Sequence, residues 1–96
     1  MSPDNIIATL KENEAVLRQR GVAHAALFGS RSRGDDGPDI DIMIEIAPDV
    51  SMDIYAYVGI TQFIEDMFPE PVDVSNRSAL KPHVKPAAER DAIYAF

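Results

Sequence analysis

Cysteine is absent from this 96-residue chain. Disulfide bonds and thiolate metal sites are therefore excluded, and a reducing, cytoplasmic location is the default expectation. No apolar run approaches the roughly 20 residues that are needed to span a bilayer, so we expect no membrane segment. The N-terminal residues Met1 to Asn5 also lack the basic start and apolar stretch of a signal peptide.

Basic side chains are also scarce. The 9 Lys and Arg residues stand against 16 Asp and Glu residues, which gives a formal net charge of −7. A protein that binds the backbone of a long nucleic acid usually presents a basic face, and here the sequence has no block of basic residues beyond short pairs such as Arg31 and Arg33. The composition therefore argues against long DNA or RNA as the substrate and favours a small anionic ligand that arrives with a divalent metal ion.

The hydrophobic content of 46% and the charged content of 26% are ordinary for a soluble globular protein, and 96 residues can bury one core. We therefore expect a single domain over residues 1–96. Periodicity, caps and turn residues predict helices over 3–20, from Ser51 to just before Pro69 and over 86–96, and strands over 22–28, 39–46 and 72–74. This order indicates an α/β (α+β) domain in which a small central sheet is flanked by helices.

The segment 39–46 has the clearest pattern in the chain. Four isoleucines share one face of the expected strand, and the other face consists of Asp39, Asp41, Met43 and Glu45. The isoleucine face fixes the register, because a slip of one residue would bury both aspartates. In the helix after Ser51, apolar residues at helical spacing predict a buried face made of Ile54, Tyr55, Val58, Thr61, Ile64, Met67 and Phe68.

A glycine-serine turn precedes this strand, and three aspartates follow it along the chain. The turn lies in the segment Gly-Ser-Arg-Ser-Arg-Gly over residues 29–34, and the acids are Asp39, Asp41 and Asp73. Such a turn offers backbone N–H groups and a hydroxyl, which suit the phosphates of a nucleotide. Carboxylates at i and i+2 of a strand point the same way, and their hard oxygens suit Mg²⁺. The order predicts phosphoryl or nucleotidyl transfer.

Each of these residues has an expected role. Three converging carboxylates repel one another, and a bound divalent cation relieves that repulsion. With two Mg²⁺ ions, one can activate the attacking oxygen while the other neutralises the departing pyrophosphate. The predicted catalytic residues and metal ligands are Asp39, Asp41 and Asp73, with Asp73 as a candidate general base. The predicted nucleotide-binding residues are Gly29, Ser30, Arg31 and Arg33.

Three segments together resemble the minimal nucleotidyltransferases of the polymerase-beta-like superfamily: Leu27 to Gly34, Asp39 to Ile42 and Val72 to Val74. The resemblance implies a mixed-sheet nucleotidyltransferase core, ATP as the substrate and Mg²⁺ as the cofactor. It further implies an antitoxin that is paired with a HEPN-domain ribonuclease toxin and that transfers AMP from ATP to a tyrosine of the toxin. Only 8 residues separate Ser30 from Asp39 here, and relatives often have a longer stretch.

Two other functions stay open at this point. The chain could be a non-catalytic antitoxin that masks its partner, because the aromatic-rich helix after Ser51 offers an interface. It could also transfer a nucleotide to a small molecule, although enzymes of that kind usually have an added domain for the acceptor. A protein acceptor is therefore the favoured expectation.

Overall fold

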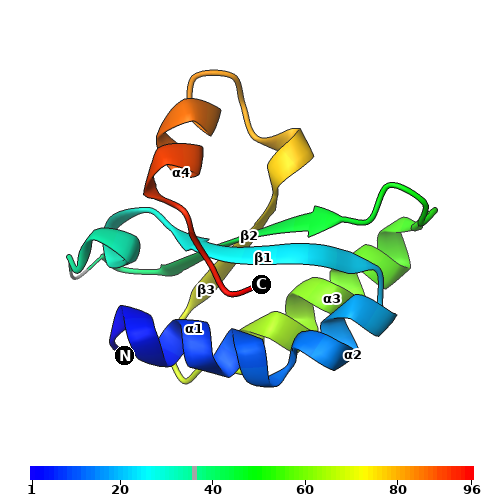
Figure 1. The fold of residues 1–96 in the computed structure, drawn as a ribbon, viewed down its shortest axis with the longest axis horizontal. Coiled ribbons are helices and arrows are strands. Elements are labelled where there is room, and N and C mark those ends of the chain that lie inside the picture. The colour runs from blue at the N-terminus through cyan, green and yellow to red at the C-terminus, as the bar shows by residue number, and fades with distance from the viewer. Residues whose placement is uncertain (36) are drawn as a thin grey trace.

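The computed structural model describes residues 1–35 and 37–96, and it contains a four-stranded mixed sheet (Figure 1). The strands are β1 (Val22–Phe28), β2 (Ile40–Ile46), β3 (Val72–Asn76) and β4 (Ile93–Tyr94), in the spatial order β3-β2-β1-β4. Strand β1 pairs antiparallel with β2 and β4, whereas β2 pairs parallel with β3. The expected α/β domain with a mixed sheet is therefore confirmed.

Helices flank the sheet on both faces. Figure 1 shows α1 (Pro3–Glu12), α2 (Glu14–Gln19) and α3 (Ile54–Glu65) together on one face and α4 (Lys85–Asp91) on the other. Two 3₁₀ helices, η1 (Ser30–Arg33) and η2 (Arg77–Ala79), directly follow β1 and β3. In the described part of the chain, no helix has both the length and the apolar character that a membrane crossing requires.

The main core lies between the sheet and the layer of α1, α2 and α3. Ile40, Ile42 and Ile44 are fully buried there, while Ile46 at the end of the strand is only partly buried. Burial of such a side chain stabilises the fold by about 1.5–3 kcal/mol before entropy is subtracted. The alternation predicted for β2 is therefore confirmed, although Met43 on the acidic face is also buried.

The first helix is shorter than predicted. Two helices replace the single helix expected over 3–20, and Asn13 stands between them with φ −104° and ψ 11°. Its side chain donates a hydrogen bond to the Thr9 carbonyl at 2.9 Å, and its backbone N–H donates to Leu10. The asparagine side chain hydrogen-bonds readily to nearby backbone, so it ends α1 here. The apolar periodicity that predicted one helix continues past this point and does not report the break. The predicted start is confirmed, since Ser2 caps α1.

The helix after Ser51 starts later than expected and presents a different face. Asp53 is its N-cap, because its carboxylate accepts a hydrogen bond from the Ala56 N–H at 2.8 Å. The predicted cap at Ser51 is therefore wrong. The predicted buried face is wrong in its first turns, since Ile54 and Tyr55 are 71% and 86% exposed. The residues of α3 that are buried are Ile60 and Ile64.

The C-terminal segment is a helix followed by a strand, and the helix expected over 86–96 ends at Asp91. Ala92 has extended backbone, and Ile93–Tyr94 then pairs with β1. The Ala95 N–H donates to the Ala25 carbonyl at 2.8 Å. Residues 93–95 thus form hydrogen bonds with the edge of β1 that would otherwise be open. This strand pairing outweighs the weak helical pattern of the sequence.

Candidate active site

Gly29 is the point at which β1 turns toward η1, and no other residue fits there. Its backbone has φ +75° and ψ −158°, a conformation that essentially only glycine adopts. A Cβ built on Gly29 would lie 2.5 Å from Oδ2 of Asp41. The turn and the acid are therefore in direct contact, as expected from the opposition of Phe28 and Asp41 in the antiparallel ladder.

Hydrogen bonds close the turn after Gly29. The Gly29 carbonyl accepts from the N–H and the hydroxyl of Ser32, at 3.1 and 2.6 Å. The hydroxyl of Ser30 lies against Gly37, where an added Cβ would be 2.0 Å from Ser30 Oγ. Ser30 therefore occupies a confined position, beside a residue that must be glycine unless one of the two moves.

Asp41 and Asp73 face each other across the parallel pair of β2 and β3. Their Cα atoms are register partners, so both side chains project from the same face of the sheet. Asp39 lies in the bend just before β2 and is exposed. The pKa of Asp41 is raised first by burial and then by the negative charges of Asp73 and Asp39, against the opposing effect of Arg31. The three predicted acids are thus electrostatically coupled.

This acid set suits a divalent cation that also contacts a substrate. Among the residues that the structure describes, no three acidic, histidine or cysteine side chains form a complete metal cluster. Mg²⁺ normally takes only one or two carboxylates and completes its shell with water and phosphate oxygens. Two opposed aspartates with a third nearby meet that need, and a cation would offset the repulsion that raises the pKa of Asp41.

The two arginines of the turn are held by other parts of the chain. Arg31 donates to the Gly37 carbonyl at 3.0 Å and to Glu70 at 2.8 Å, and its hydrogen bond, followed by that of the N-terminal ammonium group, lowers the pKa of Glu70 to about 2. Arg33 forms an ion pair with Asp91 of α4. Their predicted contact with phosphate stays a prediction. Sequence reasoning missed Glu70 and Asp91, because no local pattern reports pairings across 39 and 58 positions.

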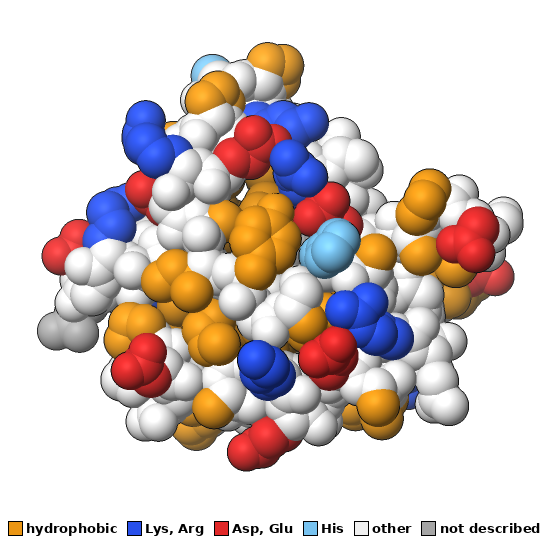
Figure 2. All heavy atoms as spheres, in the orientation of Figure 1, with side chains coloured by type: hydrophobic (Ala, Val, Ile, Leu, Met, Phe, Trp, Pro, Cys, Tyr) orange, Lys and Arg blue, Asp and Glu red, His pale blue; other side chains and the backbone are white. Residues whose placement is uncertain are grey.

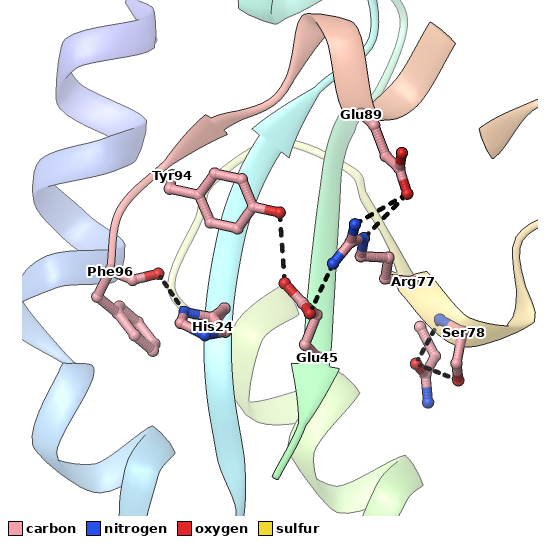
Figure 3. A network of polar contacts seen from close by, with 8 residues as sticks. His24, Glu45, Arg77, Ser78, Glu89, Tyr94 and Phe96 are labelled. Carbon is pink, nitrogen blue, oxygen red and sulfur yellow. Dashed lines mark hydrogen bonds and ion pairs between the residues drawn. The ribbon is translucent and has the colours of Figure 1, made fainter. Parts of the chain in front are cut away.

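Glu45 continues the acidic face of β2 but belongs to a separate network (Figure 3). Its carboxylate accepts from Arg77 at 2.9 Å and from the Tyr94 hydroxyl at 3.3 Å. Arg77 also donates to Glu89 of α4. These hydrogen bonds raise the pKa of Arg77, first through Glu45 and then through Glu89. The network connects η2, α4 and β4 to the sheet. Both carboxylate oxygens of Glu45 accept hydrogen bonds within it, so we assign Glu45 a structural role.

Charged side chains of both signs are interspersed on the face of the molecule that Figure 2 shows. Lys and Arg do not form a continuous basic surface there. Several of the arginines are paired with acids, including Arg18 with Glu14 at 2.7 Å and Arg77 with Glu89 at 3.0 Å. This face therefore lacks the basic surface typical of proteins that bind long nucleic acids.

A Gly-Ser turn in contact with one of two opposed aspartates, on a mixed sheet, is the arrangement expected of a nucleotidyltransferase. The family model described as "Nucleotidyltransferase domain" matches residues 10–95, and the chain belongs to that family. It is 32% identical over 89 residues to the "Putative protein adenylyltransferase MJ1379" of Methanocaldococcus jannaschii. That match covers 88% of this chain and 89% of the relative.

Solved structures share the fold. A structure described as that of a "putative minimal nucleotidyltransferase" has a TM-score of 0.76 at 19% identity, over 97% of this chain and 95% of that one. The Shewanella oneidensis complex of a tri-AMPylated HEPN toxin with an MNT antitoxin matches with a TM-score of 0.61 at 21% identity. That match covers 91% of this chain and 70% of the other. These structures confirm the expected fold, and the family model confirms the expected nucleotidyltransferase domain.

We expect the Gly29→Ala variant to lose about 1–3 kcal/mol of unfolding free energy, because alanine is strained at this φ and its Cβ would displace the Asp41 carboxylate. Urea denaturation measures the loss. Gly59→Ala is the matched control, since Gly59 lies within α3 and an added Cβ there meets nothing within 4 Å. The control should gain up to about 1 kcal/mol. Equal effects at the two glycines would contradict the role of Gly29.

Proposed function

We propose that this nucleotidyltransferase transfers AMP from ATP to the hydroxyl of a protein partner, with Mg²⁺ as the cofactor. The partner we favour is a HEPN toxin, the acceptor group is a tyrosine, and the modification neutralises the toxin. The proposal depends above all on one observation, the contact between Gly29 and the Asp41 carboxylate. That contact brings a phosphate-binding turn and an acid pair to the same point.

The chain offers a role for each residue of the site. Backbone N–H groups near Gly29 and the Ser30 hydroxyl bind the terminal phosphates, as such turns do. Asp39, Asp41 and Asp73 are the residues that would hold Mg²⁺. The metal would supply positive charge for the phosphates and for the leaving pyrophosphate. Arg31 and Arg33 belong to the same turn, and they would approach the phosphates only if their ion pairs with Glu70 and Asp91 open.

The transfer itself is a displacement at the α-phosphorus of ATP. The acceptor oxygen forms a bond to that phosphorus, and the bond from the α-phosphorus to the oxygen that bridges it to the β-phosphate breaks. Pyrophosphate leaves with the electron pair of that bond. Asp73, at the exposed position of the acid pair, accepts the proton of the acceptor hydroxyl. Catalysis of this kind is mostly positioning and charge stabilisation.

A protein acceptor is favoured by two comparisons with known proteins and by the surface of this chain. The relative from Methanocaldococcus jannaschii is described as a protein adenylyltransferase, and the Shewanella complex contains a toxin that bears AMP groups. On this chain, Ile54 and Tyr55 at the start of α3 leave apolar side chains 71% and 86% exposed, as residues of a protein interface often are.

The test is to express the chain with whatever protein is encoded beside it and to weigh that partner intact. We expect one or more added AMP groups when ATP and Mg²⁺ are present, and none when EDTA removes the metal. The double variant Asp39→Asn/Asp41→Asn should leave the partner unmodified and active. If this variant still neutralises the partner in cells, the chain acts by masking, which the exposed apolar residues of α3 would also permit.

A further inference from the structure

A pocket of about 320 Å³ lies between the Gly-Ser turn and α4. One wall comes from the end of β1 and from the turn, the other from α4 and the loop before it, and the lining includes Phe28, Gly29, Arg33, His83, Val84 and Ala87. Figure 1 shows α4 on the face of the sheet opposite to α1, α2 and α3. Asp41 and Asp73 are on the face of α4, because the alternating residues Ile42 and Val74 pack into the core on the other side. One wall thus consists of residues outside all of the sequence motifs.

The lining suits a flat aromatic ligand. Small-molecule pockets of about 300–1,000 Å³ are mostly apolar and contain a few polar groups that orient the ligand. Here Val84 and Ala87 are apolar, and Phe28 and His83 supply rings on which a base can stack. Arg33 and Asp91 also line the pocket, and their ion pair joins the two walls. Such a pocket has stacking surfaces and polar groups for the edge of a nucleobase.

The position of the pocket points to the same ligand. Gly29 lines it and also contacts the Asp41 carboxylate, with no side chain in between. A nucleotide whose phosphates contact Gly29 and Ser30 therefore has its sugar and base within reach of this pocket. A larger groove of about 510 Å³ lies on the other side of Val84, between Tyr57, Leu80 and Lys81. No residue of the Gly-Ser turn lines that groove.

We propose that the pocket between the Gly-Ser turn and α4 binds the nucleoside part of ATP, with His83 and Ala87 in contact with the base. This inference rests on the proposed function, because it assumes that the phosphates bind at Gly29 and Ser30. It adds a base-binding wall on a segment that the motifs do not include. The pocket, and not the larger groove, then determines the preference among nucleotides.

The experiment compares two ligands in the presence of Mg²⁺, ATP and inorganic tripolyphosphate, by titration calorimetry. Tripolyphosphate has the phosphates but no nucleoside. Ala87→Trp fills the pocket, and His83→Ala removes an exposed ring without disturbing the core. Both variants should bind ATP at least about fivefold more weakly, since stacking of one base contributes about 1–3 kcal/mol. Both should bind tripolyphosphate as the unchanged chain does. Leu80→Trp, which fills the larger groove, is the matched control and should bind both ligands normally.

Three results would overturn the inference. The first is an equal loss of both ligands in His83→Ala, and the second is unchanged ATP binding in His83→Ala and Ala87→Trp. The third is a loss of ATP binding in Leu80→Trp alone, which would place the base in the larger groove. All three leave the proposed function standing. A chain that binds neither ATP nor tripolyphosphate would instead overturn the proposed function, and this inference with it.

Discussion

Asp41→Asn should reduce the rate of AMP transfer at least about a hundredfold and yet make the metal-free protein more stable. The loss is expected because a cation that binds and neutralises phosphates contributes several kcal/mol to the transition state, and Asn is a poor substitute for the carboxylate that holds it. The gain has a different cause. Burial and the charges of Asp73 and Asp39 raise the pKa of Asp41, so its ionised form is unfavourable in the folded chain.

The sign of the stability change follows from linkage. A carboxyl group whose folded pKa is raised binds its proton more tightly in the folded state than in the unfolded state, so stability decreases as pH rises through the pKa of the unfolded chain and then through the folded one. At neutral pH the ionised Asp41 therefore lowers the free energy of unfolding, and the neutral side chain of Asn removes this destabilisation. We expect the melting temperature in EDTA to rise by about 2–4 °C.

Two measurements and one control decide this prediction. Transfer is followed by the intact mass of the partner, and stability by thermal unfolding in EDTA. Asp49→Asn removes the same charge from an exposed loop, and it should change neither result. A variant with lower activity and a lower melting temperature would show that Asp41 supports the fold, and would contradict its role as a metal ligand held under repulsion.

The strand that bears this aspartate was predictable because its pattern is unambiguous. Period-two alternation over β2 fixes both its structure and its two faces, since any other register would bury charge. The Gly-Ser turn was predictable for a related reason. A glycine allows the tight backbone turn by itself, and the turn therefore does not depend on contacts with distant residues. These two segments account for most of the candidate site.

What the sequence could not predict depends on distant contacts. The pairing of Arg33 with Asp91 and of Arg31 with Glu70 requires the complete fold, and so does the strand that ends the chain. The face of α3 was predicted wrongly for another reason. This helix is apolar on more than one side, so its periodicity does not distinguish a buried stripe from an exposed one. The sheet decides which side is covered.

Ile42→Ala should strongly destabilise the fold. Ile42 is fully buried at the centre of the sheet, opposite Leu27 on β1 and Val74 on β3. Truncation to alanine removes three buried carbons and leaves a cavity between sheet and helices. We expect a loss of about 2–5 kcal/mol in the free energy of unfolding, a large part of the 5–15 kcal/mol that is usual for domains. The melting temperature should fall by at least about 8 °C.

Ile42→Val and Tyr55→Ala are the two control variants for this prediction. The first removes one methyl group at the same position and should cost about 0.5–1.5 kcal/mol. The second truncates a larger side chain that the helical pattern assigned to the core but that is 86% exposed, so it should change stability by less than about 0.5 kcal/mol. Urea denaturation measures all three.

Because Ile42 adjoins Asp41 on the same strand, a cavity at Ile42 should also impair AMP transfer, whereas the loss of Tyr55 should affect only the binding of a partner. A large loss in Tyr55→Ala would show that α3 packs with the opposite face toward the sheet, and that the surface proposed for the partner is part of the core.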